Sequence, residues 1–176
     1  MLLKNSLKPT KLFYAKLVKP IVETPTAQKK WNNLFPLLTQ KDWNFFYSLP
    51  FKITNSTKLQ IVQFKFLHRI IPTRHLLKIM GIVDDTSCRF CKESEETLSH
   101  VFFDCAITND FLKKVSSILE HLCTHIVLPV EKQIILFGIP TINSNRVQNN
   151  IILLLKNYLY SLLMQQKLPT VEGFRN

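Results

Sequence analysis

The clearest helical pattern of apolar residues lies in the range 57–71, directly before Pro72. Its members recur at three- or four-residue spacing: Leu59, Val62, Phe66 and Ile70, with Phe64, Leu67 and Ile71 widening the apolar side. This spacing predicts an amphipathic helix that the proline closes. Outside the apolar side, Lys58, Lys65 and Arg69 fall within roughly 40° of one another at about 100° per residue, which makes a basic stripe.

Two shorter apolar patterns follow in the C-terminal half of the chain. A helix is expected to run to about Leu122 from a cap at Thr108 or Asn109. Its inward residues are expected to be Phe111, Leu112, Val115, Ile118 and Leu119. The apolar run 133–137 ends at Gly138 and fits either a short strand or a buried turn of helix.

A long helix is expected over about 144–164, with a broad apolar face within residues 151–163. Lys156 and Asn157 interrupt its apolar run well before the ~20 residues that a membrane span requires. We therefore expect a helix that packs on its own core or on a partner, and no association with a membrane.

Aromatic residues crowd the segment 31–51: Trp31, Phe35, Trp43, Phe45, Phe46, Tyr47 and Phe51. At this density they favour a core cluster, although exposed aromatic rings also stack on unpaired bases. The 176 residues are 46% hydrophobic and include three glycines, which suits a packed core and argues against glycine-rich phosphate loops. The chain is thus expected to be a small, mainly α domain with little or no β structure.

Charge is distributed unevenly along this basic chain, whose formal net charge is +11. Residues 1–87 hold 14 Lys and Arg against 4 Asp and Glu, whereas residues 88–176 hold 9 against 8. Such a concentration is typical of proteins that bind phosphates, because each neutralised phosphate releases condensed counterions. Simple solubility is the alternative. The candidate nucleic-acid contacts are Lys58, Lys65, Arg69, Arg74 and Lys78.

The strongest chemical signal is a C-x2-C-x8-H-x4-C array formed by Cys88, Cys91, His100 and Cys105. Two thiolates on a tight knuckle, followed by an imidazole and a third thiolate, suit tetrahedral Zn²⁺. Four protein ligands leave no open position for water or substrate, so the spacing predicts a structural zinc site.

Disulfides and unrelated buried thiols are the alternatives to zinc, and Cys123 lies outside the array. No cleavable signal peptide is evident, so we expect an intracellular protein, in the nucleus or cytoplasm, with reduced cysteines. Between the ligands, Ser94 is expected to cap a short helix that carries Glu95 and Glu96 in its first turn and then presents His100. Asp104 either orients an imidazole or is solvated.

Several strings resemble the zinc-binding region downstream of the reverse transcriptase in LINE-type, non-LTR retrotransposon polyproteins. They are Gln63-Phe64-Lys65-Phe66-Leu67-His68-Arg69-Ile70-Ile71-Pro72-Thr73, Gly81-Ile82, the zinc ligands, Glu96-Thr97-Leu98-Ser99-His100 and Phe102-Phe103-Asp104-Cys105. The tail is similar too, in Lys156-Asn157-Tyr158-Leu159-Tyr160 and Lys167-Leu168-Pro169-Thr170-Val171-Glu172-Gly173-Phe174. Three parts are expected: a lysine-rich basic arm over 1–30, a zinc-binding domain of the type that the resemblance implies over 31–125 with its knuckle at 88–105, and a C-terminal helical segment over 126–176.

The resemblance implies a C-terminal fragment that helps hold element RNA or target DNA near the active sites of a parent polyprotein. Its partners would be nucleic acid and the upstream polymerase part. The Asp84-Asp85 doublet lacks the aromatic-x-Asp-Asp setting of a polymerase palm, so no catalysis is expected from this chain.

Two other classes of function remain. One is a zinc-stabilised protein-interaction scaffold that docks through the apolar face at 151–163. The other is a zinc deaminase, against which the absence of an H-x-E and P-C-x-x-C signature counts, since Ser87 precedes Cys88.

Overall fold

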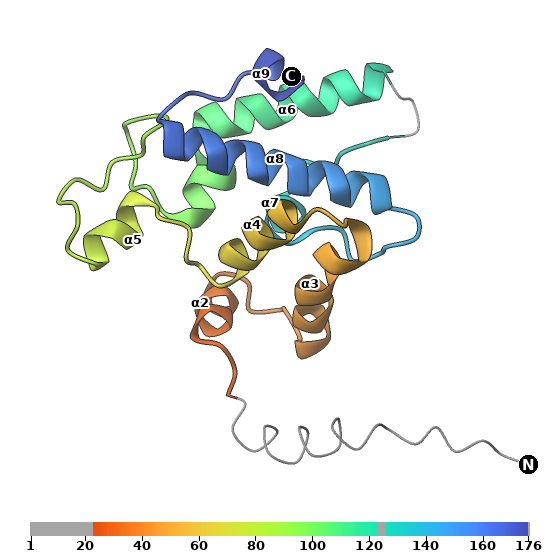
Figure 1. The fold of residues 1–176 in the computed structure, drawn as a ribbon, viewed down its shortest axis with the longest axis horizontal. Coiled ribbons are helices and arrows are strands. Elements are labelled where there is room, and N and C mark those ends of the chain that lie inside the picture. The colour runs from red at the N-terminus through yellow and green to blue at the C-terminus, as the bar shows by residue number, and fades with distance from the viewer. Residues whose placement is uncertain (1–22, 123–125, 176) are drawn as a thin grey trace, which may run out of the picture.

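The computed structural model describes residues 23–122 and 126–175, which are mainly helical (Figure 1). The helices before the metal ligands are α2 (Thr26–Leu34), α3 (Gln40–Ile53), α4 (Thr57–Leu67) and α5 (Arg74–Ile79). A π-helical turn (His100–Asp104) then leads into α6 (Ala106–Leu122), α7 (Lys132–Phe137), α8 (Arg146–Gln165) and α9 (Val171–Arg175). Within the described ranges, β structure is limited to an isolated bridge between Ser87 and Glu95. The expected mainly α fold is confirmed.

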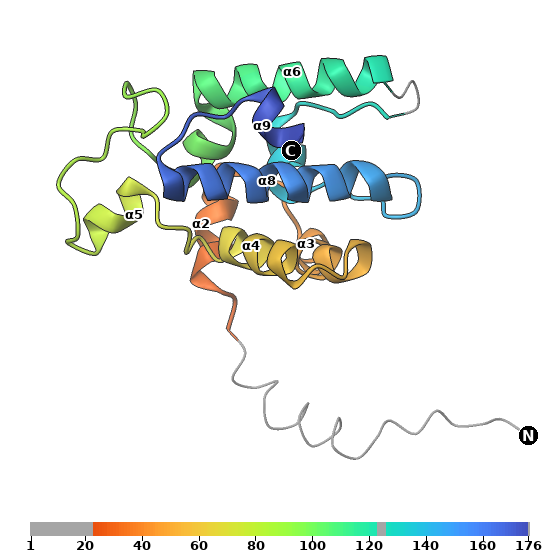
Figure 2. The same ribbon diagram turned by 45° about the horizontal axis from the view of Figure 1, so that its top comes forward.

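Helix α8 is the centre of the domain. Figure 2 shows it between α6 and α9 on one side and α4 and α3 on the other. Its buried apolar residues are Ile152, Leu153, Leu155, Leu159, Leu162 and Leu163. Full burial of each such side chain contributes about 1.5–3 kcal/mol, so this helix contributes heavily to folding. Most of the face predicted at 151–163 is thus buried in the domain's own core, while Leu154 remains 41% exposed, and docking of a partner through this face stays a prediction.

The aromatic residues of segment 31–51 form a core cluster, as predicted. Trp31 stacks on Phe66 with ring centroids 5.5 Å apart, and Phe46 stacks on Phe137 at 4.9 Å. Phe51 is the exception, since 66% of it is exposed. Phe137 and α8 belong to the predicted C-terminal segment 126–176, and they pack in the same core as residues of the predicted zinc-binding domain 31–125. Of the arm expected over 1–30, residues 1–22 lie outside the described residues and 26–30 belong to α2.

Helix α4 ends earlier than the pattern predicted, at Leu67 rather than near Pro72. Arg69 adopts a left-handed conformation with φ 57°, and the Ile70 amide donates back to the Lys65 carbonyl at 2.9 Å. This is a Schellman C-cap, which stops a helix without a proline. As a result Ile70 is half exposed instead of inward, and Arg69 does not belong to the face of α4 that carries Lys58 and Lys65.

The later helices match the predicted segments with shifted starts. Helix α6 begins at Ala106, because Thr108 is buried and donates its hydroxyl to the Val101 carbonyl instead of capping the helix. The run 133–137 is helical, not a strand. Gly138 ends it with φ 99°, and a Cβ there would lie 2.5 Å from Leu49 Cδ2.

Lys156 is a buried lysine in the middle of α8, with 1% of its surface exposed. Its Nζ donates to Gln63 Oε1 at 2.9 Å and to the Leu136 carbonyl, and it lies 4.5 Å from the centre of the Phe66 ring. Burial lowers the pKa of Lys156 well below its ordinary value. The amine thus ties α8 to α4 and α7 at a cost in desolvation.

This burial predicts a pH-dependent contribution to stability. An unfolded chain holds the lysine proton up to a pKa of about 10.4, so between the lowered folded pKa and that value the unfolded state binds more protons. The free energy of unfolding of the wild type, relative to Lys156→Met, should therefore rise from pH 7 to pH 9 by up to about 1.4 kcal/mol per pH unit. Urea titrations at each pH measure it. Exposed Lys113→Met is the control, and parallel profiles for wild type and Lys156→Met would contradict the prediction.

Candidate metal centre

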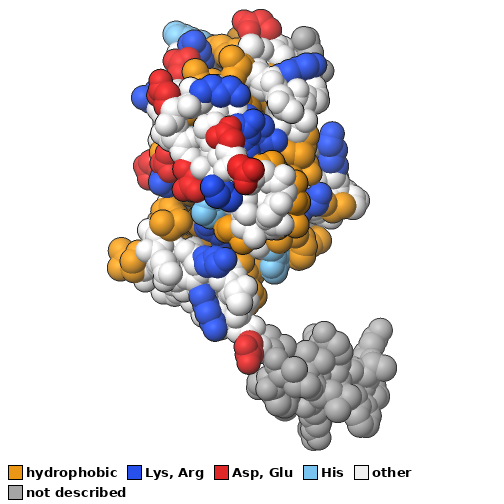
Figure 3. Space-filling view, turned by 90° about the vertical axis from the view of Figure 1, so that its left-hand side faces the viewer, with side chains coloured by type: hydrophobic (Ala, Val, Ile, Leu, Met, Phe, Trp, Pro, Cys, Tyr) orange, Lys and Arg blue, Asp and Glu red, His pale blue; other side chains and the backbone are white. Residues whose placement is uncertain are grey.

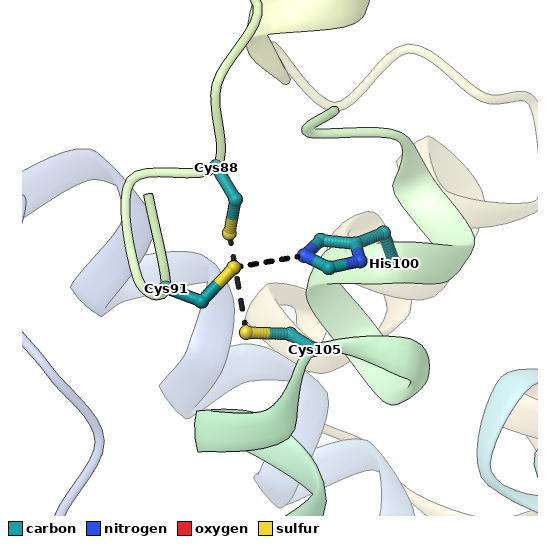
Figure 4. Close-up of side chains that lie close together, drawn as sticks. All are labelled: Cys88, Cys91, His100 and Cys105. Carbon is teal, nitrogen blue, oxygen red and sulfur yellow. Dashed lines mark hydrogen bonds between the residues drawn. The ribbon is translucent and has the colours of Figure 1, made fainter. Parts of the chain in front are cut away.

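The four predicted ligands converge on one point, as Figure 4 shows. The three sulfurs and the nearest ring nitrogen all lie within 4.8 Å of one another. Cys88 Sγ lies 4.0 Å from Cys105 Sγ, and Cys91 Sγ lies 3.4 Å from His100 Nε2. Cys88 and Cys105 are buried, whereas Cys91 and His100 are half-buried. The x2, x8 and x4 spacing therefore builds one compact site.

These distances fit a zinc ion. With Zn–S of about 2.3 Å and Zn–N of about 2.0 Å, the edges of a tetrahedron are about 3.8 Å between sulfurs and about 3.5 Å between sulfur and nitrogen. The two separations of 4.0 and 3.4 Å match those edges. Three thiolates and one imidazole are also the soft donor set that zinc prefers. A Cys₃His set is complete without water, so the site holds its metal structurally.

A tight turn places the first two ligands. The Lys92 amide donates to the Cys88 carbonyl at 2.9 Å, and Lys92 itself takes a left-handed φ of 65°. The Phe90 amide points at Cys88 Sγ from 3.4 Å. Amide groups directed at a thiolate stabilise its charge, so the turn both positions Cys88 and favours its ligand form.

The π-helical turn explains the x4 spacing between the last two ligands. The Cys105 amide donates to the His100 carbonyl at 2.7 Å, a bond that spans five residues. Such a turn brings its first and last side chains together, and π-helical turns are frequent at functional sites. The helical turn that presents His100 starts at Leu98 and not at Ser94 as expected, because Glu95 pairs with Ser87 and residues 96–97 lie outside any helix.

Cys105 sits directly before α6, where the first backbone amides of the helix are free to donate. The pKa of Cys105 is lowered to about 5, first by the hydrogen bond from the Cys88 thiol and then by the amides of Thr108 and Ile107. The shared bond and burial raise the pKa of Cys88. The amides at the start of α6 thus favour the thiolate of Cys105, which is the form that binds zinc.

A buried ion pair fixes the loop between the ligands. Glu96 is fully buried, and its carboxylate accepts from Arg89 Nη2 at 2.7 Å and from the amides of Arg89 and Arg74. Arg89 also donates to the carbonyls of Pro72 and Leu163. The sequence pattern had predicted Glu96 in the first turn of a short helix, not in a buried ion pair. No periodic pattern in the sequence identifies this ion pair, because the other groups that bond to it lie far away in the chain, at residues 72–74 and 163.

Neighbouring polar residues have structural partners. Asp104 accepts from Lys132 Nζ at 2.7 Å, an ion pair that neither predicted role for Asp104 included. His75 pairs with Glu95 at 2.7 Å outside the ligand set. Asp85 pairs with Arg74 and also accepts from the Ser87 amide, which is the first cause of the lowered pKa of Asp85. Cys123 lies outside the described residues.

The five predicted nucleic-acid contacts do not form one stripe. Lys58 and Lys78 are exposed, and Lys65 lies beside Tyr160, 3.3 Å from its hydroxyl. The Arg69 guanidinium stacks over the Trp31 ring at 4.5 Å, and burial lowers its pKa. Arg74 is held by Asp85 and Ser87. Lys58 and Lys65 therefore remain as the cations on the outer face of α4.

A helical domain with a closed Cys₃His site belongs to the class of structural zinc-binding domains. A comparison with protein families matches residues 14–111, more than half of the chain, to the family described as zinc-binding in reverse transcriptase. The chain belongs to this family, and Zn²⁺ is its cofactor. No curated protein and no solved structure matches the chain. Among the described helices, none combines the length and apolar character needed to cross a membrane.

The zinc site predicts a fixed metal stoichiometry. Purified protein should carry about one zinc ion per chain, and Cys91→Ser or His100→Ala should abolish it and loosen residues 88–105, because metal binding in such sites supplies folding energy. Elemental analysis and limited proteolysis measure the two effects. Cys123→Ser serves as the control and should retain zinc. Fresh, reduced wild-type protein without zinc would refute the assignment.

The Arg89–Glu96 pair should matter more than any exposed charge in the same loop. Glu96→Gln leaves Arg89 as an uncompensated buried charge, which costs about 3–5 kcal/mol in unfolding free energy. Substitution of the exposed residue Glu93 by Gln should change the unfolding free energy by less than about 0.5 kcal/mol. Urea denaturation in zinc-saturated buffer compares them, and equal losses would show that the pair is not structural.

Proposed function

We propose that this chain is a non-catalytic nucleic-acid-binding module, stabilised by zinc, from the C-terminal end of a LINE-type retrotransposon polyprotein. In that setting it helps hold element RNA or target DNA for the upstream polymerase part, inside the cell. Membership of the reverse transcriptase zinc-binding family supports the setting. The closed ligand set supports a metal that shapes the protein rather than one that activates water.

One observation about charge carries the nucleic-acid part of the proposal. Residues 43–83 contain no Asp or Glu, while they contain six cations: Lys52, Lys58, Lys65, Arg69, Arg74 and Lys78. This segment includes most of α3 and all of α4 and α5. The exposed side chains of a segment without acids offer phosphates favourable contacts and no repulsion from within the segment, since neutralised phosphates release counterions.

The zinc loop has the opposite character. Residues 84–96 hold five Asp and Glu against two Lys and Arg. Figure 3 shows that acidic side chains gather on the upper half of the face that carries α5 and this loop, and that they are sparse on the lower half. Phosphate contacts are therefore proposed for α4 and its surroundings, and not for the knuckle itself.

The test removes the two lysines on the outer face of α4. Lys58→Gln together with Lys65→Gln should weaken binding to RNA and DNA of any sequence. The slope of log affinity against log salt should become shallower by about 1.4 for single strands and about 1.8 for duplex DNA if each lysine contacts a phosphate. Fluorescence anisotropy across a salt series measures both quantities.

A matched control removes two exposed lysines from the more neutral half, Lys113→Gln with Lys167→Gln. It changes the net charge equally, so a purely global effect of charge would appear in both double variants. Zinc content should be unchanged in each, because none of the four lysines is a ligand. Equal slopes for wild type and the Lys58/Lys65 variant would refute the proposed contact surface.

A further inference from the structure

The outer face of α4 carries one aromatic ring, Phe64, that the helical pattern had predicted on the apolar side of the helix. Phe64 is 52% exposed, and Ile61, one turn earlier, is 48% exposed. The reason is geometric, because the core takes Leu59, Val62, Phe66 and Leu67 from the opposite side of the same helix. Burial of Phe64 on a neighbouring element would remove apolar area from water, yet the fold leaves this ring outside.

Phe64 is not an isolated exposed ring. Its centroid lies 4.3 Å from that of the His68 ring, one turn further along α4, with an interplanar angle of 39°. The His68 ring in turn lies 5.6 Å from the ring of Tyr47 on α3. We call Tyr47, Phe64 and His68 the aromatic strip. It forms a row of flat surfaces, one of which is half open to solvent.

Cations border the aromatic strip. At three- and four-residue spacing, Lys58, Ile61, Lys65 and His68 share one side of α4, with Phe64 directly beside them. Lys65 Nζ donates a hydrogen bond to the hydroxyl of Tyr160 on α8 at 3.3 Å, which holds the lysine beside this helix. Helix α4 itself holds no acidic residue. This face therefore combines exposed rings with positive charge and lacks local repulsion for a phosphate.

We propose that the α4 face formed by Lys58, Phe64, Lys65 and His68 binds single-stranded nucleic acid, with unpaired bases stacked on the aromatic strip and phosphates on the lysines. This inference rests on the proposed nucleic-acid function and specifies its ligand. Bases in a duplex are already stacked on each other, so an exposed ring gains little from them. Bases of a single strand are free to stack on a protein ring whatever their identity.

The experiment separates bases from phosphates. Zinc-loaded full-length protein is titrated with a labelled oligo(dT) strand, an abasic strand of the same length, and a duplex hairpin. Wild type should bind the base-bearing strand more tightly than the abasic strand. Phe64→Ala should weaken binding to oligo(dT) by about 5- to 150-fold, the range for loss of one base–aromatic stack, and leave binding to the abasic strand unchanged.

Two further variants identify the cause of that loss. Phe64→Trp should restore binding to oligo(dT), whereas Phe64→Leu, which stays apolar but is not aromatic, should not. Phe51→Ala is the matched control, because Phe51 is 66% exposed on α3 and lies outside the aromatic strip. It should bind like wild type. Zinc content and melting temperature should match wild type in all four, because both rings are largely outside the core.

The outcomes distinguish this inference from the proposed function. If no strand or duplex binds, both fail, and a protein partner becomes the better occupant of this face. If all three probes bind with a steep salt dependence but Phe64→Ala behaves like wild type, the nucleic-acid function stands and the stacking site is refuted. Equal losses on oligo(dT) and the abasic strand, or tighter binding to the hairpin than to oligo(dT), also refute it.

Discussion

The Arg89–Glu96 ion pair is the interaction that joins the zinc loop to the helical body. Arg89 lies between two zinc ligands, and its guanidinium reaches the Leu163 carbonyl at the end of α8 and the Pro72 carbonyl before α5. Glu96 holds the first amide of α5. Zinc closes the loop on itself, and this buried pair fixes the closed loop against the core together with the apolar side chains of Phe90, Leu98 and Phe102. The knuckle and the helical layers therefore form one structural unit.

The helical body is held together mainly by apolar burial. Its core is made of side chains from α2, α3, α4, α6, α7 and α8 and is continuous with apolar residues of the zinc segment, and Lys156 also ties α8 to α4 and α7. The segment 84–105 has little regular backbone bonding apart from one bridge and the π-helical turn. Metal binding supplies the order that hydrogen-bonded secondary structure supplies elsewhere.

Sequence periodicity located α4, α6 and α8 because each buries one side at helical spacing. It failed at their ends, where local backbone bonding decides. Arg69 ends α4 because it takes a left-handed conformation, and its guanidinium stacks on Trp31. Hydrophobic spacing does not predict an arginine in such a cap. Periodicity also treated Lys156 as an interruption, whereas two acceptors from distant segments, Gln63 and Leu136, let it lie in the core.

The zinc ligands were predictable because their spacing along the chain is typical of zinc sites. The contacts of the residues around them were not predictable from the sequence. Glu96 was placed in the first turn of a short helix, because the sequence does not show that Arg89 becomes its partner in the folded loop. Phe64 was assigned to the core because composition cannot show which of seven apolar positions on α4 and its extension remain outside. The same folding step that closes the core around Phe66 turns Phe64 and His68 toward solvent. The proposed binding face is thus a product of how α4 packs on α8, and the zinc loop contributes to it by fixing the domain rather than by touching the ligand.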